Sequence, residues 1–299
     1  MRFGKPLGGG EADERVFQFD ATFHHYRRAK LAARHERLGK YFRTSEFSPQ
    51  VRDTICRFVV GRLTTEHPAC FQFADDVLSC NLTGERLAFD ARFELRSVES
   101  SNDVRPPYAC AFDALASQVQ EDLAVVTAPR DKPHQLSAIH LCFPNAWAAE
   151  DKIGRTFAAI HEPVAGMEQI NRQGEALVDT MLNATDGLVR FAWGVTWDDE
   201  LNHHPQPPMS GTRRVARFDR SNPRAFLRVE RQTIWGFPDV SAALFTIRTY
   251  LYDCADVRRD PARRDALISA LQTMSSESAA YKGIASSRDA FVGWLGSAP

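Results

Sequence analysis

The chain has 299 residues, a formal net charge of -1, and 37 basic against 38 acidic side chains, which excludes a strongly basic nucleic-acid-binding protein. Hydrophobic residues make up 43% of the chain and charged residues 25%, a composition typical of a globular protein with a sizeable core. No window approaches the roughly 20 apolar residues that a membrane-spanning helix needs, so we expect a cytoplasmic protein with neither membrane nor nucleic acid as a partner. Six cysteines lie far apart without a CxxC pair, which argues against a zinc or iron–sulfur site and for buried free thiols.

Helical patterns dominate the first 90 residues. Residues 26–41 form a strongly basic helical pattern, and residues 49–63 place Val51, Ile55, Phe58 and Val59 on one face. We expect these helices to form an N-terminal wrap over residues 1–90, and we expect extended patches in CFQFADDVLSCNL and ERLAFDARF. The basic run HHYRRAKLAARHERLGK is interpreted as a solvated helix face.

The middle of the chain, residues 91–255, is expected to form the core. Residues 110–128 look helical through Leu123 and then become apolar, and four later segments are extended: 135–143, 187–197, 224–235 and 242–253. Helices are expected again in residues 256–299. These patterns predict a single α+β domain over residues 1–299, with a central antiparallel sheet.

The last two strands flank the turn-like sequence GFPDVS and should form a hairpin. Pairing them symmetrically about this turn sets Glu230 opposite Arg248 and Arg228 opposite Tyr250, all on one face of the sheet. If that face meets water, it is an ordinary ladder of exposed ion pairs. If it faces inward, it lines a pocket for a polar or ionic ligand, and the sequence leaves both readings open.

A histidine stands at the end of an apolar helical pattern in FAAIHEPVAG, residues 157–166. Ile153, Phe157 and His161 recur at i, i+4 and i+8, so His161 continues the apolar stripe, and Pro163 then ends the helix. Such a histidine could be an axial ligand to a flat cofactor. The alternative is a core histidine that is hydrogen-bonded to a backbone carbonyl.

Several segments together resemble one known family. The pieces are QEDLAVV, LCFPNAWAAEDKIGRTFAAIHEPVAG, LRVERQTIWGFP and FTIRTYLYD, with weaker similarity in VFQFDATFHHYRRAKLAARHERLGKYF. In order and spacing they are similar to the alpha subunit of the haem-dependent oxidative N-demethylases, the dimethylamine monooxygenase family. The resemblance implies a Per-Arnt-Sim-like antiparallel sheet with flanking helices closing over haem b, and it assigns the iron-ligand role to His161.

The resemblance also implies an activity, the oxidative N-demethylation of a small secondary amine with O₂. Glu230 is the first candidate for the carboxylate that holds the substrate ammonium, and Glu162 is the second. Candidate groups around bound oxygen and the haem propionates are Arg228, Arg248 and Tyr250, and further cofactor contacts are Arg231 and Trp193, the latter with sheet core as the alternative.

Electrons must come from elsewhere, because the chain has no Gly-rich dinucleotide fingerprint and no cysteine framework for a cluster. In the family, a partner reductase with FMN and [2Fe–2S] draws on NADPH, and a folate-binding subunit accepts formaldehyde. Two other functions stay open: a haem-based sensor, and a haem-free small-molecule-binding module. An absorption spectrum separates the haem functions from the last one, and amine-dependent NADPH consumption separates enzyme from sensor.

Overall fold

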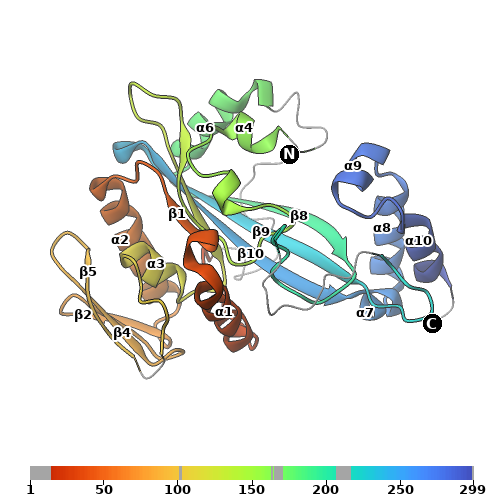
Figure 1. Cartoon of the computed structure of the whole chain (residues 1–299), viewed down its shortest axis with the longest axis horizontal. Coiled ribbons are helices and arrows are strands. Elements are labelled where there is room, and N and C mark those ends of the chain that lie inside the picture. The colour runs from red at the N-terminus through yellow and green to blue at the C-terminus, as the bar shows by residue number, and fades with distance from the viewer. Residues whose placement is uncertain (1–14, 101–102, 163, 165–170, 207–216, 298–299) are drawn as a thin grey trace.

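The computed structural model describes residues 15–100, 103–162, 164, 171–206 and 217–297. Its centre is a six-stranded antiparallel sheet in the order β1-β7-β6-β10-β9-β8 (Figure 1). The strands are β1 (Phe42–Thr44), β6 (Asp122–Thr127), β7 (Gln135–His140), β8 (Leu188–Thr196), β9 (Phe226–Phe237) and β10 (Ala242–Asp253). The predicted α+β class with an antiparallel sheet is therefore confirmed.

The N-terminal part combines helices with a second sheet. Its helices are α1 (Phe23–Tyr41), α2 (Pro49–Glu66) and α3 (Ala111–Ala116), and a four-stranded sheet contains β2 (Phe71–Ala74), β3 (Val77–Cys80), β4 (Glu85–Phe89) and β5 (Leu95–Glu99). Ser48 caps α2 by accepting a hydrogen bond from the Val51 amide, and Pro49 fits the first turn. Both predicted helices are present, and β2, β3 and β4 lie in the two segments that were predicted to contain extended patches.

All four strands predicted for the central sheet are present, but two strands of that sheet, the short β1 and β6, were missed. The expected helix over 110–123 ends at Ala116, and residues 122–127 form β6 between β7 and β10. Because β6 is buried on both faces, its apolar run lacks the alternation that marks a half-exposed strand.

The register of the β9–β10 hairpin differs from the predicted one by a single residue. Arg248 pairs with Arg231 and Glu230 pairs with Thr249, so the predicted pairing of Glu230 with Arg248 is wrong. The connection has four residues, including η3 (Pro238–Val240) and left-handed Ser241, so the strands are not symmetric about a central residue. Since side chains alternate along a strand, this slip moves Glu230 to the opposite face from Arg248.

Each face of the large sheet has its own helical cover. We call one side the α2 face: Leu123, Val125 and Leu244 point to it and pack in one cluster with apolar side chains of α2. We call the other side the α4 face, because it is covered by α4 (Phe157–His161) and α6 (Gly174–Leu182). Figure 1 shows α4 and α6 together above the sheet, away from α2.

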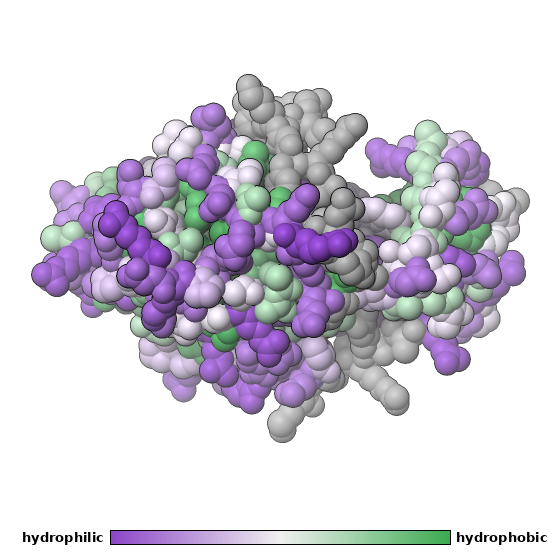
Figure 2. All heavy atoms as spheres, turned by 90° about the horizontal axis from the view of Figure 1, so that it is seen from above, coloured by the Kyte–Doolittle hydropathy of each residue, from purple (hydrophilic) through white to green (hydrophobic). Residues whose placement is uncertain are grey.

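The C-terminal helices pack at the far end of the sheet. They are α7 (Cys254–Arg259), α8 (Pro261–Gln272), α9 (Ser276–Tyr281) and α10 (Arg288–Gly296), and they form a core with Val195 and Trp197 near the end of β8. Seen from above, they make a lobe set apart from the main body (Figure 2). Within the described part of the chain, no helix has the length and apolar character to cross a membrane.

The basic helix α1 buries four of its cations, Lys40 and the three described next, contrary to the expected solvated face. Arg27, Lys30 and Arg34 recur on one side of the helix and are each at most 6% exposed. Arg27 pairs with Glu85 at 2.5 Å, and Arg34 pairs with Asp113. The Lys30 ammonium donates to the carbonyl of Ala116 at 2.7 Å and to that of Glu121. These contacts join α1 to α3, β4 and the start of β6.

Replacing Arg34 tests this buried cationic face. Arg34→Met leaves the Asp113 carboxylate buried without its main counter-charge, and removal of one partner of a buried ion pair costs about 3–5 kcal/mol. Arg37→Met is the control on the same helix, because Arg37 is 57% exposed and its pair with Glu150 spans 3.4 Å. Urea unfolding should show a large loss of unfolding free energy for the first variant only. Equal losses would contradict a special role for the buried pair.

The lowered pKa of His140 predicts that the stability of the fold depends on pH. It is buried with Nε2 at 3.3 Å from Asp113, and burial lowers its pKa from 6.5 to about 4. The unfolded chain therefore binds the proton more tightly, so the contribution of neutral His140 is complete above pH 6.5 and is lost as the pH falls toward 4. At about 1.4 kcal/mol per pKa unit, the difference in unfolding free energy between the wild type and His140→Gln should shrink by about 3 kcal/mol over that range. A difference independent of pH would argue against a depressed pKa.

Candidate functional site

His161 closes a short helix that is separate from the residues before it. The prediction that Ile153, Phe157 and His161 lie on one helix is wrong in part. Gly154 has a φ of +75°, which no α-helix accommodates, so Ile153 lies outside the helix. Helix α4 begins only at Phe157, after Thr156. Ile153 nevertheless packs in the same apolar cluster as Ile160 of α4, against Phe245 of the sheet.

Three polar side chains hold α4 in place on the sheet. Thr156 caps the helix by accepting from the Ala159 amide, and His134 Nε2 accepts from the Phe157 amide at 2.9 Å. At the other end, the Lys152 ammonium donates to the Ile160 carbonyl at 2.5 Å. Both ends of the helix are thereby satisfied, so the position of His161 is fixed by side chains outside α4.

The imidazole of His161 is held in one tautomer. Its Nδ1 lies 2.8 Å from the carbonyl oxygen of Phe157, which can only accept, so Nδ1 carries the proton and Nε2 carries the lone pair. Burial lowers the pKa of His161, and the positive charges of Arg190 and Lys152 lower it further, while the hydrogen bond to Phe157 raises it. The neutral imidazole with a lone pair on Nε2 is the form that ligates a metal. A hydrogen bond from His161 to a backbone carbonyl is thus compatible with ligation of a metal, although the sequence analysis treated the two as alternatives.

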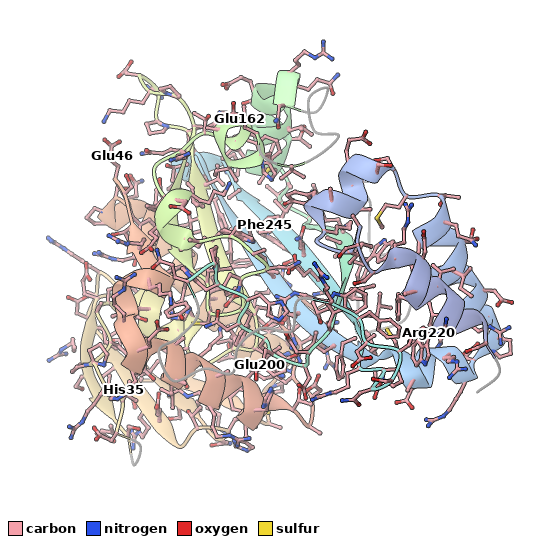
Figure 3. The ribbon with its side chains drawn as sticks, turned by 45° about the vertical axis from the view of Figure 1, so that its right-hand side comes forward. His35, Glu46, Glu162, Glu200, Arg220 and Phe245 are labelled. Atoms are coloured by element: carbon pink, nitrogen blue, oxygen red, sulfur yellow. The ribbon has the colours of Figure 1, made fainter. Side chains whose placement is uncertain are left out.

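A chain of polar side chains crosses the α4 face beside His161. Arg190 on β8 donates to Gln232 Oε1 on β9, and Gln232 Nε2 donates to Glu230 Oε2 at 3.1 Å. Arg228 Nε approaches the other carboxylate oxygen of Glu230 at 3.4 Å. Phe245 lies on the same face between α4 and the C-terminal helices (Figure 3). The face therefore offers apolar surface next to a positioned carboxylate.

Arg231, Arg248 and Tyr250 lie on the α2 face, away from His161. Arg231 donates to the carbonyl of Arg15 at 2.7 Å, Arg248 pairs with Asp20 at 2.8 Å, and Tyr250 bonds to Gln18. The Arg248 guanidinium also stacks over the ring of Tyr250, at 4.6 Å from its centroid. All three residues hold the N-terminal segment 15–20 on the sheet. The predicted common face of Arg248 and Tyr250 with Glu230 is therefore wrong, and the cause is the one-residue slip of the hairpin. Arg231 follows Glu230 directly on β9, so it lies on the opposite face in either register.

The remaining predicted residues have mixed positions. Trp193 points to the α2 face and packs with the core of the C-terminal helices, so the sheet-core alternative holds for it. Glu162 follows α4 directly and its side chain is exposed. Arg228 does lie on the α4 face, but it is 1% exposed and donates to the carbonyls of Leu201 and Phe143 at 3.0 and 2.6 Å. Of the predicted hairpin and β8 residues, only Glu230 and Arg228 lie on the α4 face, which the helix of His161 covers.

Arg190, Gln232 and Lys282 were not among the predicted site residues, although the strand pattern had set Gln232 on the side of Glu230. In the sequence of β8, Phe191 and Trp193 alternate with Arg190 and Ala192, so Arg190 lies on the face opposite the aromatic side chains, which was the signal available for it. Gln232 shares the strand parity of Glu230. Lys282 carried no signal, because it reaches β8 from beyond α9: its ammonium donates to the carbonyl of Trp193 at 2.6 Å.

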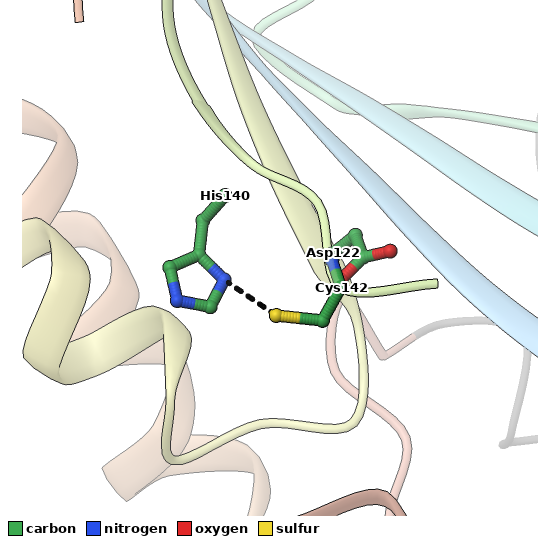
Figure 4. Close-up of side chains that lie close together, drawn as sticks. All are labelled: Asp122, His140 and Cys142. Carbon is green, nitrogen blue, oxygen red and sulfur yellow. Dashed lines mark hydrogen bonds between the residues drawn. The ribbon is translucent and has the colours of Figure 1, made fainter. Parts of the chain in front are cut away.

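A second cluster of titratable side chains lies at the start of β6 and the end of β7. The potential ligand atoms of Asp122, His140 and Cys142 are all within 4.8 Å of one another. Figure 4 shows the His140 ring turned toward the Cys142 sulfur, with Nδ1 and Sγ 3.8 Å apart. Both carboxylate oxygens of Asp122 accept backbone amides at 2.8 Å, and its negative charge interacts with Lys30. The trio is therefore satisfied as a buried hydrogen-bonded cluster beside a lysine, without an added cation.

Comparison with known families agrees with the resemblance inferred from the sequence segments. The model of the family described as haem-dependent oxidative N-demethylase, alpha subunit-like, matches residues 10–292. The match spans almost the whole chain, including α4, the polar residues of the α4 face and the C-terminal helices. The chain belongs to the haem-dependent oxidative N-demethylase alpha subunit-like family.

Proposed function

We propose that this chain is the haem b-binding subunit of an amine monooxygenase that removes a methyl group from a small secondary amine such as dimethylamine. The methyl carbon leaves as formaldehyde, and O₂ is reduced with two electrons from a partner reductase and gives one water. The observation that carries the proposal is the fixed tautomer of His161, which leaves the Nε2 lone pair free on a helix that covers the partly apolar α4 face of a family member.

The α4 face suits a flat, largely apolar cofactor. His161 would hold the iron, while Phe245 and Ile160 would meet the porphyrin plane. When bound, haem supplies the activation of O₂. The antiparallel sheet with helices inserted between β7 and β8 is consistent with the Per-Arnt-Sim-like architecture that the resemblance implies.

The protein's own contribution to the chemistry is substrate positioning and proton handling. A secondary amine is a cation at neutral pH, and the carboxylate of Glu230 would bind its ammonium and accept its proton at Oε1 or Oε2. Gln232 fixes one of these oxygens, which limits the rotation of the carboxylate. Because Glu230 is only 17% exposed, the contact would be stronger than an ion pair in water.

The proposal includes partners, since the sequence has no dinucleotide fingerprint of its own. We expect NADPH, FMN and [2Fe–2S] on a separate reductase subunit, and a folate-binding subunit that takes up formaldehyde. We expect this assembly in the cytoplasm. Co-purification with an amine-dependent NADPH oxidase activity would support these partners.

Removal of His161 tests haem ligation. His161→Ala should lower haem occupancy severely or shift the Soret band, because the iron loses its protein donor. His25→Ala is the control, since His25 is exposed on α1. The readout is the absorption spectrum and the haem-to-protein ratio. Unchanged occupancy and spectrum in His161→Ala would remove His161 from this role, and wild-type protein without a Soret band after haem reconstitution would contradict the haem function itself.

Substitution of Glu230 tests the carboxylate role. Glu230→Gln keeps the shape and the hydrogen bond to Gln232 but cannot attract an ammonium or accept its proton, so turnover should fall by something like 10²–10⁴-fold. Haem content should stay normal. Glu162→Gln is the comparison, because Glu162 is exposed beside the ligand. If amine-dependent NADPH oxidation survived in Glu230→Gln and disappeared in Glu162→Gln, the role would belong to Glu162.

A further inference from the structure

Two opposite charges lie near each other at the edge strand β8 without forming an ion pair. Glu230 is on β9, and Lys282 comes from the turn after α9. The Lys282 ammonium donates to the Trp193 carbonyl on β8, and residue 193 directly follows Ala192, the register partner of Glu230. Directly paired residues of antiparallel strands have Cα atoms about 4.5–5.5 Å apart, so the two charged side chains approach the same short stretch of the sheet.

Neither charge is neutralised by the other. Among the described residues, no carboxylate lies within 4.0 Å of the Lys282 ammonium, and its printed hydrogen bond to Trp193 uses one of three N–H donors. Within the part of the chain that the structure describes, the cation paired with Glu230 is Arg228 at 3.4 Å, and that guanidinium also donates to the carbonyls of Leu201 and Phe143. The charge of Glu230 still acts on Lys282 and raises its pKa, although burial, the larger effect, lowers it.

A separated carboxylate and ammonium are complementary to a ligand that carries both charges in the reverse order. We propose that Glu230 and Lys282 together bind a zwitterionic amine, with the ligand ammonium on Glu230 and the ligand carboxylate on Lys282. The substrate class is then an N-methylated amino acid, and this inference rests on the amine-binding role proposed above for Glu230. Simple dimethylamine would satisfy Glu230 alone and leave the half-buried Lys282 without a counter-charge.

The position of Lys282 suits it to discriminate N-methylated amino acids from simple amines. It is anchored by a 2.6 Å hydrogen bond and lies over the Trp193 ring at 5.5 Å from its centroid, so little side-chain entropy remains to be lost on binding. A carboxylate at this place has two possible sources, the substrate or a haem propionate. We assign it to the substrate, because Lys282 approaches the strand position of Glu230, where the amine is proposed to bind.

The test measures binding directly, by calorimetric titration of the purified protein with N,N-dimethylglycine and with dimethylamine. Wild type should prefer N,N-dimethylglycine. Lys282→Gln should weaken N,N-dimethylglycine binding by about 10–100-fold, as expected for loss of a charge-assisted hydrogen bond, and leave dimethylamine binding within about twofold. Lys282→Arg keeps the positive charge and should retain most of the preference. Lys132→Gln, at an exposed pair with Glu46, is the control and should change neither affinity.

Each contrary outcome is distinct. Equal binding of the two ligands by wild type, or an equal loss of both in Lys282→Gln with an unchanged melting temperature, would overturn the zwitterion site. Loss of haem in Lys282→Gln with unchanged ligand affinity would assign the lysine to a propionate and also overturn it. If Lys282→Gln failed to fold, Lys282→Arg would decide, because a preference lost with the charge retained contradicts the proposal. The titration needs no haem, so a missing Soret band would refute the proposed monooxygenase while leaving this site measurable.

Discussion

The buried cations of α1 determine where the centre of the large sheet begins. Lys30 donates to the carbonyls of Ala116 and Glu121, and Arg27 donates to that of Ser117, so one helix satisfies the backbone between α3 and β6. That segment would otherwise carry buried acceptors without donors, at a cost of about 1–3 kcal/mol each. Because β6 pairs with both β7 and β10, fixing its first residue also fixes the strands that carry α4 and the hairpin.

The sequence predicted elements whose signal is local and missed those whose signal is tertiary. The strands 188–196, 226–237 and 242–253 alternate or are bounded by turns, and they were recognised. Strand β6 could not be distinguished from a buried helix, since both of its faces are apolar. The basic face of α1 looked solvated because its partners, Glu85 and Asp113, lie more than 50 residues away in the chain. The chain alone gives no sign that such distant carboxylates meet that helix.

The residues of the candidate site could be predicted only where the sequence showed which face of the sheet each side chain points to. Arg248 and Tyr250 were assigned to the face of Glu230 through a hairpin register one residue in error. Arg231 is next to Glu230 on β9 and lies on the opposite face in any register. The left-handed residue of the turn is Ser241, not glycine or asparagine, so the sequence carries no clear mark of a four-residue connection. Because side chains alternate between the two faces along a strand, a register error of one residue moves a side chain from the face of the proposed site to the face where it makes structural contacts.

Similar polar residues have different roles on the two faces of the sheet. On the α2 face, Arg231 and Arg248 are occupied by Arg15 and Asp20 of the N-terminal segment, so they stabilise the fold. On the α4 face, Gln232 bonds to Glu230, and the carboxylate stays near the surface at 17% exposed. A protein gains little stability from holding a carboxylate and a separate ammonium in a half-buried place, because each retains part of its desolvation cost. Such an arrangement is better explained by a ligand that supplies the missing partners, which is why the chemistry is assigned to the α4 face.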